Sequence, residues 1–424
     1  MNKPIFLPSE ILLPNPDCSL TKWSVIACDQ YTSSPEYWSR VESLVGDSPS
    51  AFRIVLPEIY LNSEDVGQRI QTINRTMKNY SETVLRTVPP SYLYIERTLP
   101  DGSVRKGILG MLDLESYSFD PAAHAPVRAT EGTVLSRIPV RVQIRRDAPL
   151  ELPHVMLLAD DKEGSLFHTA ESCAKDRGTL LYSFDLMMNA GSLKGWSLAS
   201  RDCESLIQEF AHYSEHAPRD PAGFPMVFAV GDGNHSLAAA KTCYEEQKQK
   251  LGADALHHPS RFALAELVNL YDSSLSFEPI FRCVFGTDRE ELTGSLLASY
   301  PGSSVSGMDP VPSDGTHVFR CISREGEWTA CVPNPGHSLP VGTLQSFLDR
   351  YLESHPGAAV DYIHGEAEVR KICRERDAVG FLFEGMDKSD LFPAVLTDGP
   401  LPRKTFSMGE ADDKRFYLEC RKIL

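Results

Sequence analysis

Apolar residues recur at every third or fourth position in several segments of the chain. Between residues 63 and 80 they follow a polar start and fall on one side of a helix. A helix is also expected to start near Ser34, which suits an N-cap, with Pro35 in its first turn. The same spacing predicts helices at residues 203–216, 234–250, 261–267, 343–352 and 366–376.

Short apolar runs and alternating apolar and polar residues predict strands. The runs 91–97 and 104–112 flank a Pro-Asp-Gly-Ser stretch, whose Asp-Gly pair is typical of a hairpin turn. Residues 139–145 alternate apolar and charged side chains, which predicts a strand with one buried face. Further strands are expected at residues 24–28, 54–57, 154–160, 180–184, 225–230, 318–322, 328–332 and 379–383.

Helices and strands are mixed throughout the chain. This mixture predicts an α/β or α+β fold with mixed sheets rather than an alternating parallel barrel. We expect an N-terminal α/β region at residues 1–120, a central region at 121–300 and a C-terminal α/β region at 301–424 that completes the functional site. A turn-rich segment at residues 300–315 supports the second boundary.

A strand-to-helix turn is the most informative local feature. The apolar run at residues 225–230 ends at Gly231, and an alanine-rich helix directly follows Gly233. Such a turn leaves several backbone N–H groups unpaired at the positive end of the helix dipole, where an anion such as phosphate binds. The next three residues, Asn-His-Ser, add side-chain donors. The alternative is a glycine turn whose Asn or Ser only caps the helix.

Composition excludes several classes of protein. The 424 residues carry a formal net charge of −16, which argues against sequence-independent binding of nucleic acid or of an anionic membrane. No stretch reaches the roughly 20 apolar residues of a membrane span, and the N-terminus lacks a signal-peptide core. The ten cysteines form no Cys-x-x-Cys pair, so nothing points to zinc, an Fe–S cluster, haem or flavin. We therefore expect a cytoplasmic protein with free thiols; its oligomeric state stays open.

Three parts of the chain resemble a known family. They are Ile26–Ser33 with the following Pro35–Trp38, the turn Gly231–Ser236, and Leu401–Gly409. On these segments the chain is identified as a member of a bacterial and archaeal family of uncharacterised proteins, domain of unknown function 1015. The likeness extends over nearly the whole chain, and the family name implies no activity.

The turn is also similar to that of the ParB and sulfiredoxin superfamily, one branch of which is the free-serine kinases. The resemblance implies a strand-turn-helix core that holds the phosphates of a nucleotide. Asp232 and Gly233 match the start of the superfamily motif, and His235 stands where His or Thr is found. Asn234 replaces a His, and Ser236 replaces an Arg. Since a Ser hydroxyl cannot replace a guanidinium charge, either another cation reaches the site or the ligand carries less charge.

Candidates for the missing cation lie elsewhere in the chain. Arg128 falls in a short run with hydroxyl and carboxylate residues, and Arg137 and Arg141 follow closely. Lys404 and Thr405 follow a Pro-rich turn near the C-terminus. The alternative for each charged residue is an ordinary solvated surface charge. The residues expected to bind phosphate or a nucleotide are therefore Gly231, Asp232, Gly233, Asn234, Ser236, Arg128, Lys404 and Thr405.

Three residues are candidates for acid–base catalysis. Asp29 follows a buried strand in a loop before a helix, a common place for a catalytic carboxylate, although it could instead cap the helix. Glu131 could act as the base or pair with Arg128. His235 lies in the anion-binding turn itself. A Mg²⁺ ion is expected if the phosphoryl donor is ATP or ADP, and its ligands stay unknown.

Together these features predict a phosphoryl-transfer enzyme, a kinase or a phosphatase, that acts on a small hydroxylated metabolite. The superfamily resemblance makes serine or phosphoserine the first candidate, so the partner is a small phosphate-bearing molecule. One alternative is a nucleotide-binding regulator without catalysis. Another is a hydrolase or lyase that uses His235 as its base.

Overall fold

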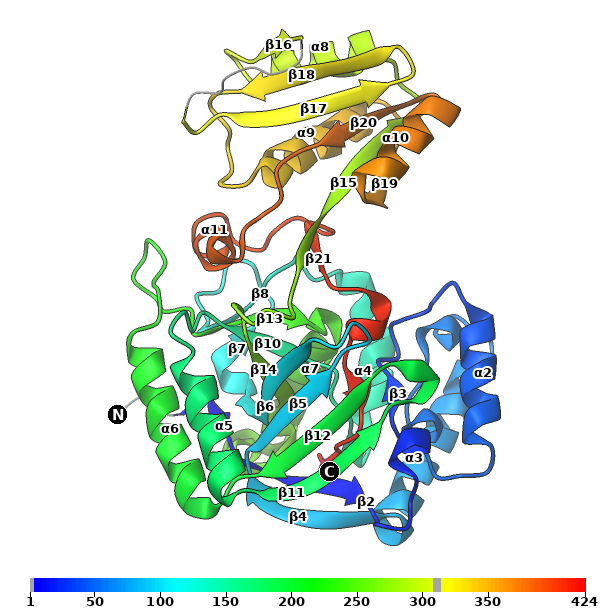
Figure 1. The fold of residues 1–424 in the computed structure, drawn as a ribbon, viewed down its shortest axis with the longest axis vertical. Coiled ribbons are helices and arrows are strands. Elements are labelled where there is room, and N and C mark those ends of the chain that lie inside the picture. The colour runs from blue at the N-terminus through cyan, green and yellow to red at the C-terminus, as the bar shows by residue number, and fades with distance from the viewer. Residues whose placement is uncertain (1–3, 308–313) are drawn as a thin grey trace. The chain divides into compact units, whose positions relative to one another are not determined.

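Helices and strands are mixed along the whole chain in the computed structural model, which describes residues 4–307 and 314–424 (Figure 1). This confirms the predicted mixed α/β class. The chain forms two compact units. Unit 1 consists of Met1–Leu275 together with Glu410–Leu424, and unit 2 consists of Ser276–Gly409. The three regions expected from the sequence stay a prediction, because compactness does not test which segments fold independently.

Unit 1 is built on a large mixed sheet. Its strand order is β11-β12-β5-β6-β14-β10-β13-β8-β7, and β1 pairs with β6. The β10–β14, β8–β13 and β7–β8 pairs are parallel, and the others are antiparallel. The strands are β1 (Phe6–Leu7), β5 (Leu93–Thr98), β6 (Val104–Asp113), β7 (Tyr117–Ser118), β8 (Val127–Ala129), β10 (Met156–Ala159), β11 (Thr179–Asp185), β12 (Ser192–Ser197), β13 (Phe228–Asp232) and β14 (Phe262–Asn269).

The side chains of β5 alternate between two hydrophobic cores, as expected for a strand buried on both faces. Tyr94 joins a core formed with α5, α6 and α7, whereas Leu93 and Ile95 join a core formed with α2, α3 and the C-terminal segment. Figure 1 shows α5 and α6 lying alongside each other. The helices are α1 (Leu20–Trp23), α2 (Pro35–Val45), α3 (Val66–Thr83), α4 (Ile138–Arg146), α5 (Ser165–Arg177), α6 (Ser200–Glu215) and α7 (Asn234–Leu251).

The C-terminal segment of unit 1 is anchored by short strands. β22 (Phe416–Tyr417) pairs with β3 (Val25–Ile26), and β23 (Arg421–Lys422) pairs with β9 (Leu150–Glu151). A separate antiparallel pair joins β2 (Ser9–Pro14) to β4 (Leu85–Ser91). These pairings place the C-terminal residues beside segments from near residues 25 and 150.

Unit 2 contains a second sheet with the order β16-β18-β17-β20-β15-β19, and β21 pairs with β15. All of its strand pairs are antiparallel. The strands are β15 (Phe277–Phe285), β16 (Ser304–Ser306), β17 (His317–Ser323), β18 (Gly326–Val332), β19 (Ala359–His364), β20 (Ala378–Leu382) and β21 (Phe406–Met408). The helices are α8 (Arg289–Ser299), α9 (Pro340–Ser354), α10 (Glu366–Glu375) and α11 (Leu391–Asp398).

Three predictions of secondary structure were wrong. Residues 54–57 form no strand. The expected strand at 139–145 is part of α4, because the buried Ile138 and Val142 lie one helical turn apart and Pro139 lies in the first turn, where it loses no hydrogen bond. The expected helix at 261–267 is β14. Its residues are buried almost without interruption, and a short apolar run of this kind fits a central strand as well as a helix.

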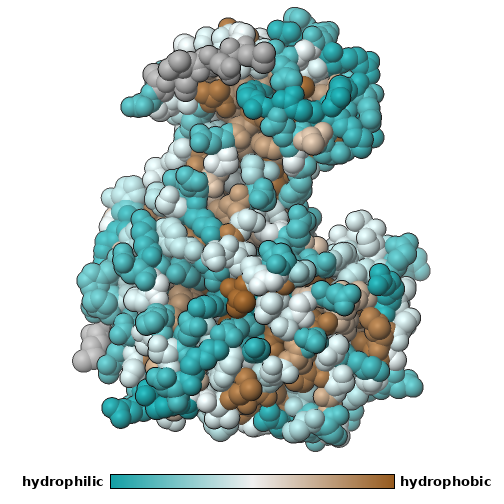
Figure 2. Space-filling model, viewed as in Figure 1, coloured by the Kyte–Doolittle hydropathy of each residue, from teal (hydrophilic) through white to brown (hydrophobic). Residues whose placement is uncertain are grey.

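Hydrophilic residues cover most of the face seen in Figure 2, and apolar residues reach that surface in separate small groups. Within the described ranges, every helix is too short or too polar to cross a bilayer.

A buried network of charges lies against the large sheet. Arg97 on β5 is opposite Arg105 on β6, and both side chains are almost fully buried. Glu266 on β14 interacts electrostatically with both, and its carboxylate lies 3.1 Å from Nε of the buried Arg415. Gly107 makes room for Glu266, because a Cβ at this position would come within 2.3 Å of Oε1 of Glu266. The negative charge therefore offsets several buried positive charges.

This network also holds the C-terminal segment. Arg97 donates a 3.0 Å hydrogen bond to the carbonyl of Asp412, and Arg105 donates one of 2.6 Å to the carbonyl of Asp413. The backbone just before residue 414 is thus tied to the sheet by buried side chains.

Replacement of Glu266 by alanine should destabilise unit 1 by about 3–5 kcal/mol, since it leaves buried guanidinium groups without their counter-charge. Thermal and urea unfolding followed by tryptophan fluorescence measures the effect, because Trp23, Trp38 and Trp196 all lie in unit 1. The exposed Glu204 on α6 provides the control, and Glu204→Ala should change stability by less than about 0.5 kcal/mol. Equal effects of the two substitutions would contradict the role of the network.

Candidate functional site

The predicted strand-turn-helix is confirmed. β13 ends at Asp232, Gly233 has φ +79°, and α7 begins at Asn234. Glycine is required at the turn for two reasons. The backbone conformation is left-handed, and a Cβ would approach the Cα of Val155 to 3.0 Å. The turn therefore lies directly against the backbone that leads into β10.

The first turn of α7 presents its backbone N–H groups away from the helix. The first backbone hydrogen bond of the helix runs from the Leu237 amide to the Gly233 carbonyl, at 2.9 Å. The amides of Asn234, His235 and Ser236 precede it and have no carbonyl partner within the helix. Together with the helix dipole, these amides favour an anion at this position.

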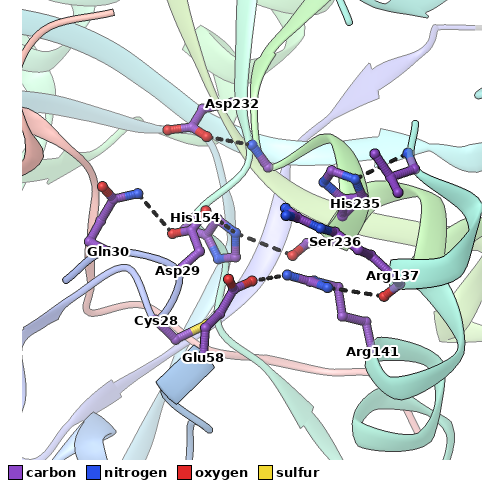
Figure 3. A network of polar contacts seen from close by, with 12 residues as sticks. Cys28, Asp29, Gln30, Glu58, Arg137, Arg141, His154, Asp232, His235 and Ser236 are labelled. Atoms are coloured by element: carbon purple, nitrogen blue, oxygen red, sulfur yellow. Dashed lines mark hydrogen bonds and ion pairs between the residues drawn. The ribbon is translucent and has the colours of Figure 1, made fainter. Parts of the chain in front are cut away.

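Ser236 is linked to a histidine that the sequence analysis did not single out (Figure 3). Oγ of Ser236 lies 3.2 Å from Nε2 of His154, and Nδ1 of His154 lies 2.7 Å from the hydroxyl of Tyr417. The same hydroxyl contacts Cys28, at 3.0 Å from its sulfur and 3.2 Å from its amide nitrogen. Both ring nitrogens of His154 are thus held, which fixes the orientation of the imidazole.

Asp29 lies near the same ring nitrogen of His154 as Ser236. Its Oδ2 is 4.0 Å from Nε2 of His154, and its Oδ1 accepts a 3.1 Å hydrogen bond from Gln30. Burial alone would raise the pKa of Asp29, but His154, Gln30 and Lys414 together hold this pKa below its ordinary value. Asp29 is therefore a carboxylate at neutral pH, close to both His154 and the turn.

Cys28 is not suited to act as a nucleophile. Burial, reinforced by the nearby Asp29 carboxylate, raises the pKa of the Cys28 thiol to about 12. The thiol stays protonated at neutral pH, so its role is to position Tyr417 rather than to react.

His235 has a different environment from His154. Its Nε2 accepts a 3.2 Å hydrogen bond from the Val134 amide. Burial, together with the positive charges of Arg141 and Arg137, lowers the pKa of His235 to about 4. The ring is neutral at pH 7, its acceptor nitrogen is occupied, and Nδ1 carries a proton to donate. This arrangement favours His235 as a hydrogen-bond donor over a general base.

Three cationic side chains lie near the turn. Nζ of Lys414 lies 3.4 Å from Oδ2 of Asp232, whose other oxygen accepts a 2.8 Å hydrogen bond from the Gly233 amide. Arg141 forms an ion pair with Glu58. The Arg137 side chain is exposed near His235, as Figure 3 shows. Lys414 was missed in the sequence, because it stands in a polar stretch without any recognisable motif.

Three other residues predicted from the sequence, Arg128, Glu131 and Asn234, differ in burial and in hydrogen-bond partners. Arg128 donates a 2.9 Å hydrogen bond to the carbonyl of Ala125 and a 2.8 Å bond to the carboxylate of Asp220. Its charge is thus already paired. Glu131 is half-buried. The side chain of Asn234 makes only a long hydrogen bond, 3.5 Å, to the carbonyl of Val230.

Lys404 and Thr405 belong to unit 2. Lys404 is exposed, with φ +60°, and its carbonyl accepts a 2.9 Å hydrogen bond from Arg282. The buried Thr405 hydroxyl donates a 2.6 Å hydrogen bond to the carbonyl of Pro402. Their part in phosphate binding stays a prediction.

The side chains that converge in unit 1 come from distant parts of the sequence. Asp29, His154, Ser236 and Tyr417 meet at the first turn of α7, and a cavity of about 150 Å³ adjoins them. Within the described residues, no three His, Cys, Asp or Glu side chains gather in a way that could hold a metal ion by themselves. The arrangement combines an anion-binding helix end, an ionised carboxylate and an oriented imidazole.

Comparisons with known proteins agree with the expected family. A search of curated proteins finds no match. Among solved structures, a variant of a free serine kinase in complex with AMP is 12% identical with a TM-score of 0.41, covering 74% of this chain and 91% of that one. A free serine kinase variant in complex with ADP is 13% identical with a TM-score of 0.41, and the match covers 77% of this chain and 95% of that one. A conserved hypothetical protein from Pyrococcus furiosus is 13% identical with a TM-score of 0.37, and the match covers 74% of this chain and 94% of that one.

Similarities of this size say nothing about the reaction of this chain. The family model described as "Protein of unknown function (DUF1015)" matches residues 8–351, which is most of the chain. The chain therefore belongs to the DUF1015 family.

Proposed function

We propose that unit 1 binds the phosphates of a nucleotide at the first turn of α7 and transfers a phosphoryl group to the hydroxyl of a small metabolite. One observation carries the proposal: Asp29, His154 and Ser236 converge on a helix end that presents unpaired amides. Phosphoryl transfer needs that combination of an anion site and a nearby proton acceptor.

The phosphate would accept hydrogen bonds from the amides of residues 234–236 and from the Ser236 hydroxyl. Two cations supply the charge that the motif arginine provides elsewhere. Arg137 is exposed beside His235, and Lys414 lies next to Asp232. The neutral His235 adds an N–H donor, because its Nδ1 carries the proton.

In the reaction, the hydroxyl oxygen of the acceptor forms a bond to the terminal phosphorus of the donor. The bond from that phosphorus to the bridging oxygen breaks, and the shortened nucleotide leaves with the electron pair. The hydroxyl proton passes to Asp29, directly or through His154, whose orientation is held by Tyr417. Serine is the first acceptor to test, because the turn resembles that of the free-serine kinases.

Mg²⁺ enters this proposal with the nucleotide. It usually binds through one or two carboxylates together with substrate phosphates, and Asp232, beside the turn, is the carboxylate that would hold it. When bound, the ion would neutralise part of the phosphate charge.

The Ser236–His154 contact also favours a second candidate, a hydrolase in which His154 activates the Ser236 hydroxyl. The two candidates differ in what they consume. The transferase needs a nucleotide and an acceptor, whereas the hydrolase turns over a single ester or phosphate ester in water without nucleotide.

Asp29→Asn should lower kcat by about 10²–10⁴-fold, because the amide cannot accept the acceptor's proton. Nucleotide affinity should change little. Turnover is followed by ³¹P NMR with serine, Mg²⁺ and either ATP or ADP, and affinity by calorimetry. Glu204→Gln on the exposed face of α6 is the matched control and should keep full activity. Undiminished turnover by the Asp29 variant would rule out the assigned base.

Lys414→Met should raise the Kd for the nucleotide by about 10-fold or more, since a charge-assisted hydrogen bond is lost. The methionine keeps most of the side-chain length without the charge. Lys422→Met, at an exposed position of β23, is the control and should leave the Kd unchanged. Calorimetric titration at fixed ionic strength measures both constants. Similar Kd values for the wild type and the Lys414 variant would show that the phosphates bind elsewhere.

His235 should make stability depend on pH in a defined direction. Its pKa is about 4 in the folded protein and about 6.5 when unfolded, so only the unfolded chain gains a proton between these values. The contribution of the neutral His235 to stability is full above pH 6.5 and is progressively lost as the pH drops toward 4. Urea unfolding of wild type and His235→Asn at pH 7 and pH 5 tests it. The wild type should lose more stability on acidification than the variant, and parallel losses would contradict the neutral state of the half-buried His235.

A further inference from the structure

The cavity next to Ser236 is lined mainly by hydrocarbon side chains. Its volume is about 150 Å³, and it lies where the two hydrophobic cores of unit 1 meet, because residues of both cores form its walls. The apolar wall includes Leu237 and Ala240 of α7, Ile144 of α4, Met77 of α3, and Leu56 and Leu264. Native cores rarely leave a space of this size unfilled.

The charged groups in the cavity wall are already paired with one another. Glu58 forms an ion pair with Arg141, and Glu151 lies 2.5 Å from Arg145 and 2.6 Å from Arg421. A carboxylate oxygen of Glu151 also accepts a 2.9 Å hydrogen bond from the Leu264 amide. A ligand in the cavity would therefore make mainly apolar contacts, because the charged side chains of the wall already have ion-pair partners.

The polar end of the same cavity is the candidate site. Ser236 and His154 both line it, together with Tyr417 and Cys28. A ligand whose hydroxyl or phosphate contacts Ser236 and His154 can thus place the rest of its structure among the aliphatic side chains. Serine would leave this space empty, and its ammonium and carboxylate groups would face charges that already have partners.

We infer that the cavity is a binding pocket for the apolar part of the acceptor, and that the acceptor is a hydroxyl compound bearing a hydrocarbon group about the size of a benzene ring. The size follows from the volume, since a space of about 150 Å³ is large enough to hold benzene. The existence of an apolar binding pocket is inferred only from the volume and the lining residues of the cavity. Its identity as the acceptor pocket rests on the proposed phosphoryl transfer.

The first test measures binding of a simple probe to the full-length protein. Fluorobenzene should bind at one site, as followed by ¹⁹F NMR. Ala240→Leu on α7 and Ile144→Phe on α4 fill the pocket from two different helices, and each should weaken fluorobenzene binding by about 10-fold or more. Leu251→Phe, at an exposed position at the end of α7 outside the cavity wall, is the control and should bind like the wild type.

Two results would overturn the pocket: no fluorobenzene binding by the wild type, or binding that neither filling variant weakens. Circular dichroism and thermal unfolding check that each variant is folded, and the two filling positions are independent of each other. Arg137→Ala separates the two proposals, because it should weaken nucleotide binding while leaving fluorobenzene binding intact. Unweakened nucleotide binding by that variant counts against the proposed phosphate site and not against the pocket.

The second test concerns the acceptor. With ATP or ADP and Mg²⁺, kcat/KM for benzyl alcohol or 2-phenylethanol should exceed that for serine by about 10-fold or more, and Ala240→Leu should abolish this preference. A higher kcat/KM for serine, or a preference that survives in Ala240→Leu, would overturn the acceptor assignment. Absence of turnover with every alcohol and with serine, while fluorobenzene still binds, would overturn both the transfer reaction and the acceptor assignment and leave only an apolar pocket.

Discussion

The close approach of Gly233 to Val155 is the contact on which the site depends. Only a residue without a Cβ allows the left-handed turn to lie against the backbone that precedes β10. That approach brings the first amides of α7 beside His154, and the Ser236–His154 contact of 3.2 Å follows from it. A bulkier turn would separate the first amides of α7 from the imidazole.

The C-terminal segment is the second structural requirement. It brings Tyr417 to the ring of His154 and Lys414 to Asp232, although both residues are more than 180 positions away in the sequence from their partners. The buried arginines Arg97 and Arg105 hold the backbone just before Lys414 by hydrogen bonds to the carbonyl groups of Asp412 and Asp413. The buried guanidinium groups of Arg97 and Arg105 therefore help to position Lys414 near the turn.

The two histidines of the site show how environment assigns roles. His235 lies in the recognised turn, but burial and two neighbouring arginines lower its pKa to about 4 and make it a neutral donor. His154 lies outside any motif, yet it is held between Ser236, Tyr417 and the ionised Asp29. The contacts around each imidazole, and not the sequence pattern in which it occurs, thus set its hydrogen-bonding role.

Local pattern alone determined the mixed class, most helices and strands, and the turn that opens α7, because these depend on periodicity and on the conformational freedom of glycine. It also placed Asp29 correctly in a loop after a buried strand. Only the tertiary structure decided that residues 139–145 are helical and that 262–269 form a strand, since such short segments satisfy both periods and burial selects between them. It alone joined His154, Tyr417 and Lys414 to the turn, because contacts between residues far apart in sequence leave no local signal in a single chain.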